Sequence, residues 1–254
     1  MKYYEQLVDM ACFSRNDLTH LTGSEQRANA LIFNYKNKGF IQAVKRNLFV
    51  AISMETKQPV PSRYAIASHI TDKAYVSHHS AFEYYGLANQ VFYEVYVSST
   101  KKFAPFEYDD VTYRFIASRI SEGVEEKAGG VRITDLERTA IDSINDFEKI
   151  GGLEELLRCL ELIPCLDESK LLIYLGLYDK QFIYQKTGYL LEHYKEQLKL
   201  SAGFFAECEK HLAKSIRYLY HGVENERLSF NSKWRLFVPE KLLAIISGGG
   251  TELV

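Results

Sequence analysis

The order in which helix and strand signals follow one another over the first sixty residues restricts the fold of this 254-residue chain more than any other feature. Residues 3–12 (YYEQLVDMAC) place apolar side chains at positions i, i+3, i+4 and i+7, the spacing of an amphipathic helix. Ser14 is then a candidate N-cap for a short second helix, RNDLTHLT, which Gly23 closes. Two helices are therefore expected before residue 24.

A third helix is predicted over residues 24–38. Thr22 and Ser24 both offer a side-chain oxygen as N-cap, Thr22-x-x-Glu25 has the form of a capping box, and Gly39 follows the last turn. The apolar positions on one face are Ala28, Leu31, Ile32 and Tyr35. The opposite face displays Gln26, Arg27, Asn29, Ala30, Phe33 and Asn34.

Residues 40–52 (FIQAV-KRN-LFVAI) are two β-rich runs around a basic tip, which predicts a hairpin. Three helices followed by such a hairpin have the order of a winged helix-turn-helix. Amide and guanidinium groups on the third helix suit base edges in a major groove, and the start of that helix suits phosphate. A hairpin tip with Lys45 and Arg46 suits the DNA backbone or minor groove. Modules of this shape also dock proteins, which stays the alternative.

The charge is distributed in a way that agrees with DNA binding. The whole chain has a net charge of −2, yet six basic residues against two glutamates give residues 24–57 a net charge of +4, so that the rest carries −6. A solvated positive face is the plainer explanation of the same segment. The predicted base-reading residues are Gln26, Arg27, Asn29 and Asn34. The predicted phosphate-binding residues are Ser24, Lys36, Lys38, Lys45 and Arg46, and Asn47 completes the DNA-binding set.

A polar segment with two prolines, SMETKQPVPS, follows the hairpin and predicts a boundary between a DNA-binding domain, residues 1–57, and a second domain, residues 58–254. Within the second domain, Tyr75-Val76 has the pattern of a short strand, and Ser77 that of an N-cap for the helix HHSAFEYY. Residues 91–99 and 111–118 alternate like strands, and 131–144 is expected to be a strand end followed by a helix. Beyond residue 150 the period is mostly helical. The predicted class is α+β: a winged helix-turn-helix, then a mixed α/β domain with a mainly helical C-terminal third.

Composition excludes several classes. The chain has neither an N-terminal secretion signal nor an apolar run that approaches the length of a membrane span, so a cytoplasmic protein without membrane association is expected. The four cysteines, at 12, 159, 165 and 208, lack metal-binding or redox spacing and are expected to be reduced. Phosphate-cradling loops and dinucleotide fingerprints are absent, so no cofactor is expected.

Residues with catalytic potential have simpler structural explanations. Adjacent helical positions diverge by about 100°, so His78 and His79 cannot face one metal ion; the family resemblance described below implies one hydrogen-bonded and one exposed histidine instead. Asp135 is predicted to cap a helix and Arg138 to be a salt-bridge partner, rather than parts of a catalytic set. Glu207-x-Glu209-Lys210 has the form of a nuclease motif, but at helical spacing. Neither a metal site nor an enzyme is therefore predicted.

Two sequence blocks carry a resemblance to a known family. YVSHHSAFEYYGL (residues 75–87) and VRITDLERTAIDSI (residues 131–144), in this order after a winged helix, resemble blocks of the AbiEi family. These proteins are antitoxins of bacterial abortive-infection systems, type IV toxin–antitoxin systems. The matching positions are Val76, Ser77, Ser80, Ala81, Gly86, Leu87, Thr134, Asp135, Glu137, Arg138, Thr139 and Asp142. The resemblance covers about residues 1–160 and is weak in the helical C-terminal third.

The resemblance implies a transcriptional repressor that binds inverted repeats of double-stranded DNA in its own promoter. It further implies that the C-terminal domain counters a nucleotidyltransferase-like toxin without forming a stable complex with it. On this interpretation the block at residues 75–87 is scaffold.

Two other functions stay open at this point. A nuclease or nucleotide-handling enzyme would need Glu137, Asp142, Glu207 and Glu209 to converge on one Mg²⁺ ion. A ligand-sensing regulator would hold a small apolar effector in the aromatic-rich second domain. The basic-aromatic segment Lys233-Trp234-Arg235 is predicted to be an edge strand, with a second nucleic-acid surface as its alternative.

Overall fold

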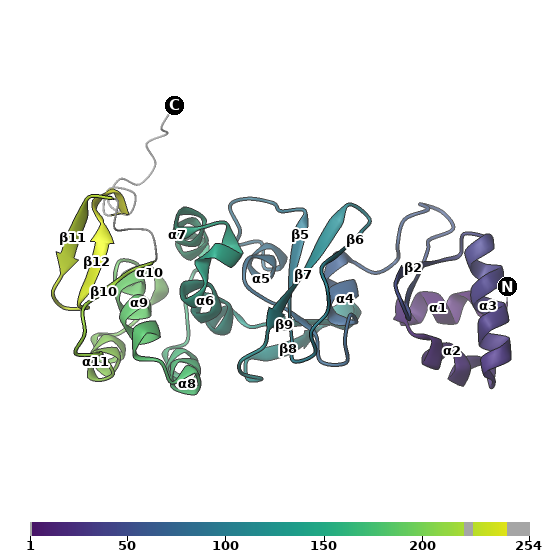
Figure 1. The fold of residues 1–254 in the computed structure, drawn as a ribbon, viewed down its shortest axis with the longest axis horizontal. Helices are drawn as coiled ribbons and strands as arrows, with labels where there is room; N and C mark the ends of the chain where they lie inside the picture. Colours follow the sequence, from purple (N-terminus) through teal and green to yellow (C-terminus); the bar gives the residue numbers. More distant parts are fainter. Residues whose placement is uncertain (1, 221–225, 243–254) are drawn as a thin grey trace, which may run out of the picture. The chain divides into compact units, whose positions relative to one another are not determined.

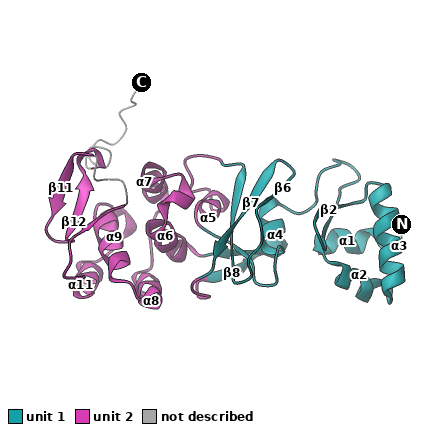
Figure 2. Cartoon of the chain, viewed as in Figure 1, with its two compact units in different colours: residues 1–77, 92–118, 124–134 teal, residues 78–91, 119–123, 135–254 magenta. Residues whose placement is uncertain are grey.

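The computed structural model describes residues 2–220 and 226–242, and the chain forms two compact units (Figures 1 and 2). The first unit comprises Met1–Ser77, Phe92–Ser118 and Val124–Thr134. The second comprises His78–Val91, Arg119–Gly123 and Asp135–Val254. The boundary predicted at residue 57 lies inside the first unit, and the idea that residues 1–57 fold as a domain of their own stays a prediction.

The first unit begins with three helices and a small sheet. The elements are α1 (Tyr4–Met10), β1 (Cys12–Phe13), α2 (Arg15–Thr22), α3 (Glu25–Asn37), β2 (Ile41–Lys45) and β3 (Leu48–Ala51). The strands form an antiparallel sheet in the order β1-β3-β2, and the two-residue strand β1 is too short to have been predicted. Leu7, Leu18, Ala28, Leu31 and Phe49 are members of one buried apolar cluster, which joins the three helices to the hairpin.

Local caps set the helix limits. Ser14 and Asp17 form a reciprocal capping box at the start of α2, and Gly23, at a φ of 79°, ends that helix in the left-handed conformation. Ser24 caps α3 by accepting a hydrogen bond from the Arg27 backbone N–H. The capping box predicted from Thr22 is wrong, because the buried Thr22 hydroxyl instead donates to the Leu18 carbonyl.

The rest of the first unit is a mixed six-stranded sheet in the order β6-β7-β5-β4-β9-β8. Its strands are β4 (Tyr75–Val76), β5 (Glu94–Ser99), β6 (Phe106–Tyr108), β7 (Val111–Ala117), β8 (Val124–Lys127) and β9 (Val131–Thr134). Helix α4 (Arg63–Ser68) packs against β4, β5 and β9, and a 3₁₀ turn, η1 (Ala128–Gly130), links β8 to β9. The pairs β4–β9 and β5–β7 are parallel, which requires crossover connections between them.

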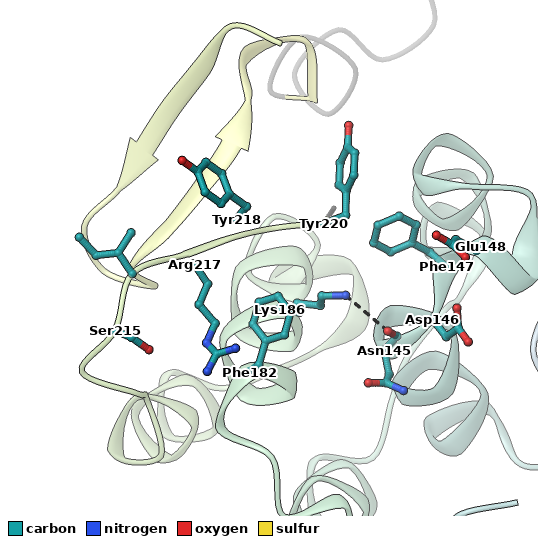
Figure 3. A pocket seen from close by; sticks show the side chains of 11 residues that line it. Asn145, Asp146, Phe147, Glu148, Phe182, Lys186, Ser215, Arg217, Tyr218 and Tyr220 are labelled. Atoms are coloured by element: carbon teal, nitrogen blue, oxygen red, sulfur yellow. Dashed lines mark hydrogen bonds between the residues drawn. The ribbon is translucent and has the colours of Figure 1, made fainter. Parts of the chain in front are cut away.

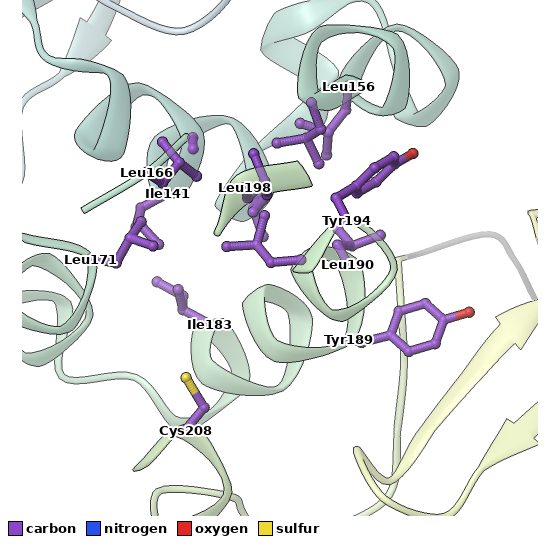
Figure 4. Close-up of a cluster of buried hydrophobic side chains, with 14 of the residues drawn as sticks. Ile141, Leu156, Leu166, Leu171, Ile183, Tyr189, Leu190, Tyr194, Leu198 and Cys208 are labelled. Atoms are coloured by element: carbon purple, nitrogen blue, oxygen red, sulfur yellow. The ribbon is translucent and has the colours of Figure 1, made fainter. Parts of the chain in front are cut away.

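The second unit is mainly helical. Its helices are α5 (His79–Tyr84), α6 (Leu136–Asn145), η2 (Phe147–Ile150), α7 (Leu153–Leu162), α8 (Glu168–Tyr178), α9 (Gln181–Glu192), α10 (Lys195–Leu198) and α11 (Ala202–Lys210). Three strands, β10 (Arg217–Tyr218), β11 (Leu228–Asn231) and β12 (Leu236–Pro239), form a sheet in the order β10-β12-β11. Ile141, Leu156, Ile183, Leu190 and Leu198 bring α6, α7, α9 and α10 into one core (Figure 4). The α+β class is confirmed.

Trp234 is the largest side chain that is fully buried in the described residues, and its contacts connect the turn before β12 with α9. Its indole N–H donates to Glu192 Oε2 at 2.7 Å, and its ring lies over Gly188 of α9. Lys233 pairs with Glu192 and Glu209, and Arg235 donates to the Ala213 carbonyl at 2.8 Å. The predicted edge strand is wrong at residues 233–235, which form the turn before the central strand β12. The polar groups of this turn are engaged within the second unit.

Gly188→Ala tests the packing of Trp234. A Cβ atom there would lie 2.1 Å from two ring atoms of Trp234, so the ring must move. We expect the substitution to lower the free energy of unfolding by about 1–3 kcal/mol, in spite of the better helix propensity of alanine. Urea unfolding provides the measurement.

Gly176→Ala is the matched control. Gly176 of α8 is exposed, and a Cβ atom added there would meet, among the described side chains, only the Tyr184 hydroxyl within 4 Å, at 3.9 Å. The substitution should stabilise the protein by up to about 1 kcal/mol. Equal effects of the two substitutions would contradict the packing argument.

Candidate nucleic-acid interface

Helix α3 is held by its inner face and leaves its outer face in solvent. Ala28 and Leu31 are buried in the apolar cluster of the first unit. The helix is 13 residues long and follows the N-cap residue Ser24. The residues exposed on the outer side are Glu25, Gln26, Arg27, Asn29, Ala30, Phe33, Asn34, Lys36 and Asn37. At 100° per residue these positions span slightly more than half of the helix surface, with Gln26 near the centre.

The four predicted base-reading residues lie together on this outer face. Within the described part of the chain, the side chains of Gln26, Arg27, Asn29 and Asn34 make neither hydrogen bonds nor ion pairs. Lys36 and Lys38 are also exposed, at the C-terminal end of α3. Phe33 is 66% exposed, so it does not pack against the hairpin. The face therefore combines amide, guanidinium and ammonium groups with one aromatic ring and, at its edge, the carboxylate of Glu25.

Two predicted contact residues have structural roles. The Ser24 hydroxyl accepts from the Arg27 backbone N–H at 3.3 Å, as an N-cap. Asn47 stands at the hairpin tip with a φ of 64°, a conformation that asparagine tolerates better than most residues. Its Oδ1 accepts a hydrogen bond of 3.0 Å from the Arg15 backbone N–H, at the start of α2. The hairpin tip is thereby fixed to α2.

The two basic residues of the hairpin tip differ in environment. Arg46 is exposed, whereas Lys45 is half-buried with its Nζ 5.2 and 5.5 Å from the ring centroids of Phe103 and Phe106. Burial, with a smaller contribution from Lys101, lowers the pKa of Lys45. Of these two residues, Arg46 is the one with a solvated charge. Sequence reasoning could not detect the aromatic cover, because it comes from residues nearly sixty positions later.

The hairpin tip lines a polar cleft of about 780 Å³ within the first unit. Lys101 and Lys102, which the sequence reasoning missed, are exposed on its other side. Neither they nor Arg46 has a carboxylate within 4 Å among the described residues. Arg132 also lines the cleft, but it donates to the carbonyls of Ser68, Thr71 and Asp72 at the end of α4. Three solvated cations thus gather at this cleft.

The histidine pair at residues 78–79 is structural. Ser77 does not cap α5; the N-cap position is held by His78, at a φ of 54° and without a side-chain cap. Both histidines are buried, which corrects the prediction that one is exposed. His79 Nε2 lies 3.2 Å from Glu155 Oε1, and this oxygen also accepts from the backbone N–H groups of Asn89 and Gln90. Burial lowers the pKa of His78, against the opposing effect of Asp142 and Asp146.

The acidic residues of α6 have the roles predicted from sequence. Asp135 caps the helix by accepting from the Arg138 backbone N–H at 2.8 Å, and Arg138 Nε donates to Asp142 Oδ1 at 2.7 Å. Glu137 accepts from the Asp167 backbone N–H. The hydroxyls of Tyr174 and Tyr178 donate to Asp135 and Asp142, respectively. These carboxylates are satisfied by protein donors.

The second acidic pair, on α11, is also engaged. Glu207 pairs with Lys210 at 2.6 Å, which is the first cause of its lowered pKa, and Glu209 pairs with Lys233 at 3.2 Å. Among the described residues there is no group of three or more His, Cys, Asp or Glu side chains placed to hold a metal ion. The four-carboxylate Mg²⁺ site of the nuclease alternative is therefore not assembled in the described structure.

Comparison with solved structures shows what the fold is similar to. No protein-family model matches the chain, and neither does any curated protein. The crystal structure of the RV2827C protein from Mycobacterium tuberculosis is similar, with a TM-score of 0.63 and 12% identity over 99% of this chain and 96% of that chain. At this identity the similarity shows a shared fold. In the described ranges, none of the helices is both long and apolar enough to span a bilayer.

Asn47→Ala tests the anchoring of the hairpin tip. Alanine loses the acceptor for the Arg15 N–H and is strained at a positive φ. We expect a loss of about 1–2 kcal/mol in the free energy of unfolding, measured in urea. Asn47→Asp keeps an acceptor oxygen beside the N-terminus of α2 and should be nearly neutral. Equal stability of the two variants would show that the side-chain contact contributes nothing.

Proposed function

We propose that this protein is a DNA-binding transcriptional repressor whose first sixty residues are a winged helix-turn-helix, and that it also acts as an antitoxin. The observation that supports DNA binding most strongly is the outer face of α3. Gln26, Arg27, Asn29 and Asn34 are exposed there together, without partners within the described part of the chain. Amides that pair with adenine and a guanidinium that pairs with guanine are the side chains suited to base edges in a major groove.

The surroundings of α3 supply the groups that a phosphate backbone requires. Lys36 and Lys38 are exposed at one end of the helix, and Arg46, Lys101 and Lys102 are solvated cations at the hairpin cleft. Such contacts give affinity that falls with salt and carry no sequence information. We assign the backbone contacts of the hairpin to Arg46 rather than Lys45, because aromatic rings cover the Lys45 ammonium.

The antitoxin part of the proposal rests on the resemblance to the AbiEi family. Its two sequence blocks lie together in the fold: Val76 of the first pairs with Ile133 of the second in the parallel β4–β9 ladder, and α5 packs against α6. The proposed partner is a nucleotidyltransferase-like toxin that is countered without a stable complex.

A gel-shift titration with DNA from upstream of the protein's own gene tests the repressor function. Binding should exceed that to random competitor DNA and weaken steeply between two salt concentrations. Binding no stronger than to random DNA would make the three-helix module a protein-docking element instead.

Arg27→Ala should reduce the preference for specific over random DNA by about 1–3 kcal/mol, because a bidentate contact to guanine is lost. The matched control is Arg15→Ala, which removes an exposed arginine from α2. It is expected to change binding to both DNAs alike and leave the preference intact. An unchanged preference in Arg27→Ala would refute the assignment of this residue.

Growth rescue tests the antitoxin function. Coexpression of the full-length chain with a toxin gene encoded beside it should restore growth. Arg27→Ala should rescue equally when both genes are expressed from a foreign promoter, because operator recognition is then irrelevant. Failure of the unaltered chain to rescue would remove the antitoxin function and leave the repressor function standing.

A further inference from the structure

A second concave site is lined only by residues of the second unit. It is a pocket of about 520 Å³ between the end of α6 with η2, the start of α9, and the segment that leads into β10 (Figure 3). Four aromatic side chains contribute to its walls: Phe147, Phe182, Tyr218 and Tyr220. The volume falls within the range of small-molecule sites, about 300–1,000 Å³.

Lys186 is the unusual group in this pocket. Only 7% of the residue is exposed, and its Nζ lies 5.0 and 4.9 Å from the ring centroids of Phe147 and Phe182. It donates one long hydrogen bond, 3.4 Å, to the Asn145 carbonyl, which leaves two of its three donors unused. No carboxylate lies within 4 Å of it among the described residues. Burial lowers its pKa to about 8.

A purely structural lysine is the simplest alternative. Two aromatic faces do attract an ammonium group, and more strongly when the pair is desolvated, but a ring face does not replace the hydrogen-bond acceptors that the ammonium has in water. Structural lysines usually keep the charged end in water or pair it with a carboxylate. Lys186 does neither: the close-up shows its ammonium between the ring-lined wall and Asn145, inside the pocket (Figure 3). A bound anion would supply the missing hydrogen bonds.

The rest of the pocket indicates what kind of anion fits. Arg217 lies over the face of Phe182 at 5.3 Å and adds a second, exposed cation. Tyr218 is 43% exposed, and one face of its ring stacks on Phe237 at 5.4 Å, so that at most the other face is available to a planar partner. Asp146 and Glu148 also line the pocket and oppose a highly charged ligand. The combination is two cations, aromatic walls and two acids that limit the ligand's total negative charge.

We propose that this pocket binds a nucleoside monophosphate, with the phosphate on Lys186 and Arg217 and the base against the aromatic walls. Lysine and arginine are the usual phosphate-binding side chains, and bases of any identity stack on aromatic rings. The sequence had suggested a small apolar effector for the second domain. The geometry favours an anionic ligand instead, because an apolar effector would leave the buried Lys186 ammonium without hydrogen-bond acceptors. The site is independent of DNA recognition by α3.

Isothermal titration calorimetry on the full-length protein, with AMP, GMP, CMP and UMP, tests the proposal. At least one should bind with a dissociation constant below about 1 mM, and more tightly than adenosine or inorganic phosphate alone. Lys186→Met keeps the length of the side chain between the two rings and should weaken binding at least about tenfold. Lys180→Met, at an exposed position just before α9, is the matched control and should not change it.

The pH dependence provides a second readout. Because the pKa of Lys186 is about 8 in the empty pocket, it loses its proton as the pH rises through 8, and phosphate affinity should fall between about pH 7 and pH 9 in the unaltered protein. Lys186→Met should show no such fall. If that variant does not fold, Arg217→Gln at the exposed rim takes its place, with the same loss of affinity expected.

The proposal would be overturned by no binding of any of the four monophosphates, by equal binding of adenosine, or by unchanged affinity in a folded Lys186→Met or Arg217→Gln variant. Equal affinity for inorganic phosphate would also overturn it, since the pocket would then be an anion site without a role for its rings.

Discussion

The hydrogen bonds of the buried Arg138 guanidinium connect several segments of the second unit. Arg138 is 1% exposed, and its hydrogen bonds reach Asp142 on its own helix and the carbonyls of Ile120 and Glu122 from a segment sixteen to eighteen residues earlier. Tyr178 of α8 donates to the same Asp142 carboxylate, and Tyr174 to the Asp135 cap. One buried ion pair thus joins α6, α8 and residues 120–122, and α6 in turn packs against α7, α8 and α9. Removal of one partner would leave an uncompensated buried charge, which is far more costly than loss of a surface pair.

This network also explains what the sequence could and could not predict. The caps at Ser14, Ser24 and Asp135 depend on atoms three residues away, so local spacing was sufficient to find them. The i, i+4 pair of Arg138 and Asp142 is local in the same sense. The hydrogen bonds of Arg138 with residues 120–122 connect segments that are distant in the sequence. The strand pairs that set the order of the six-stranded sheet do the same. A single sequence carries no signal for these.

Two of the wrong predictions also result from contacts between segments that are distant in the sequence. Lys233-Trp234-Arg235 has the composition of an exposed basic segment, yet Glu192 and Gly188 of α9, more than forty residues earlier, remove Trp234 from solvent. One histidine of the pair His78-His79 was expected to be exposed, whereas the fold buries both, and the hydrogen-bond partner of His79, Glu155, comes from α7. The candidate interface shows the reverse case. Its α3 residues were predictable because an amphipathic helix exposes whatever its core face excludes, but Lys101 and Lys102 reach the hairpin cleft only through the fold.

The cationic side chains therefore differ in whether they are free to bind a partner, and their total number does not show this. Arg132 and Arg138 are occupied by backbone carbonyls or a carboxylate, and Lys45 by aromatic rings. Arg27, Lys36 and Arg46 stay solvated. A protein-docking face would be expected to carry few charges at its centre and more than one large apolar group. The outer face of α3 has one such group, Phe33, among amides and cations, and a single ring fits a thymine methyl group better than it fills the core of a protein interface. The composition of this face thus favours DNA over a protein partner, for a reason that the net charge of the chain conceals.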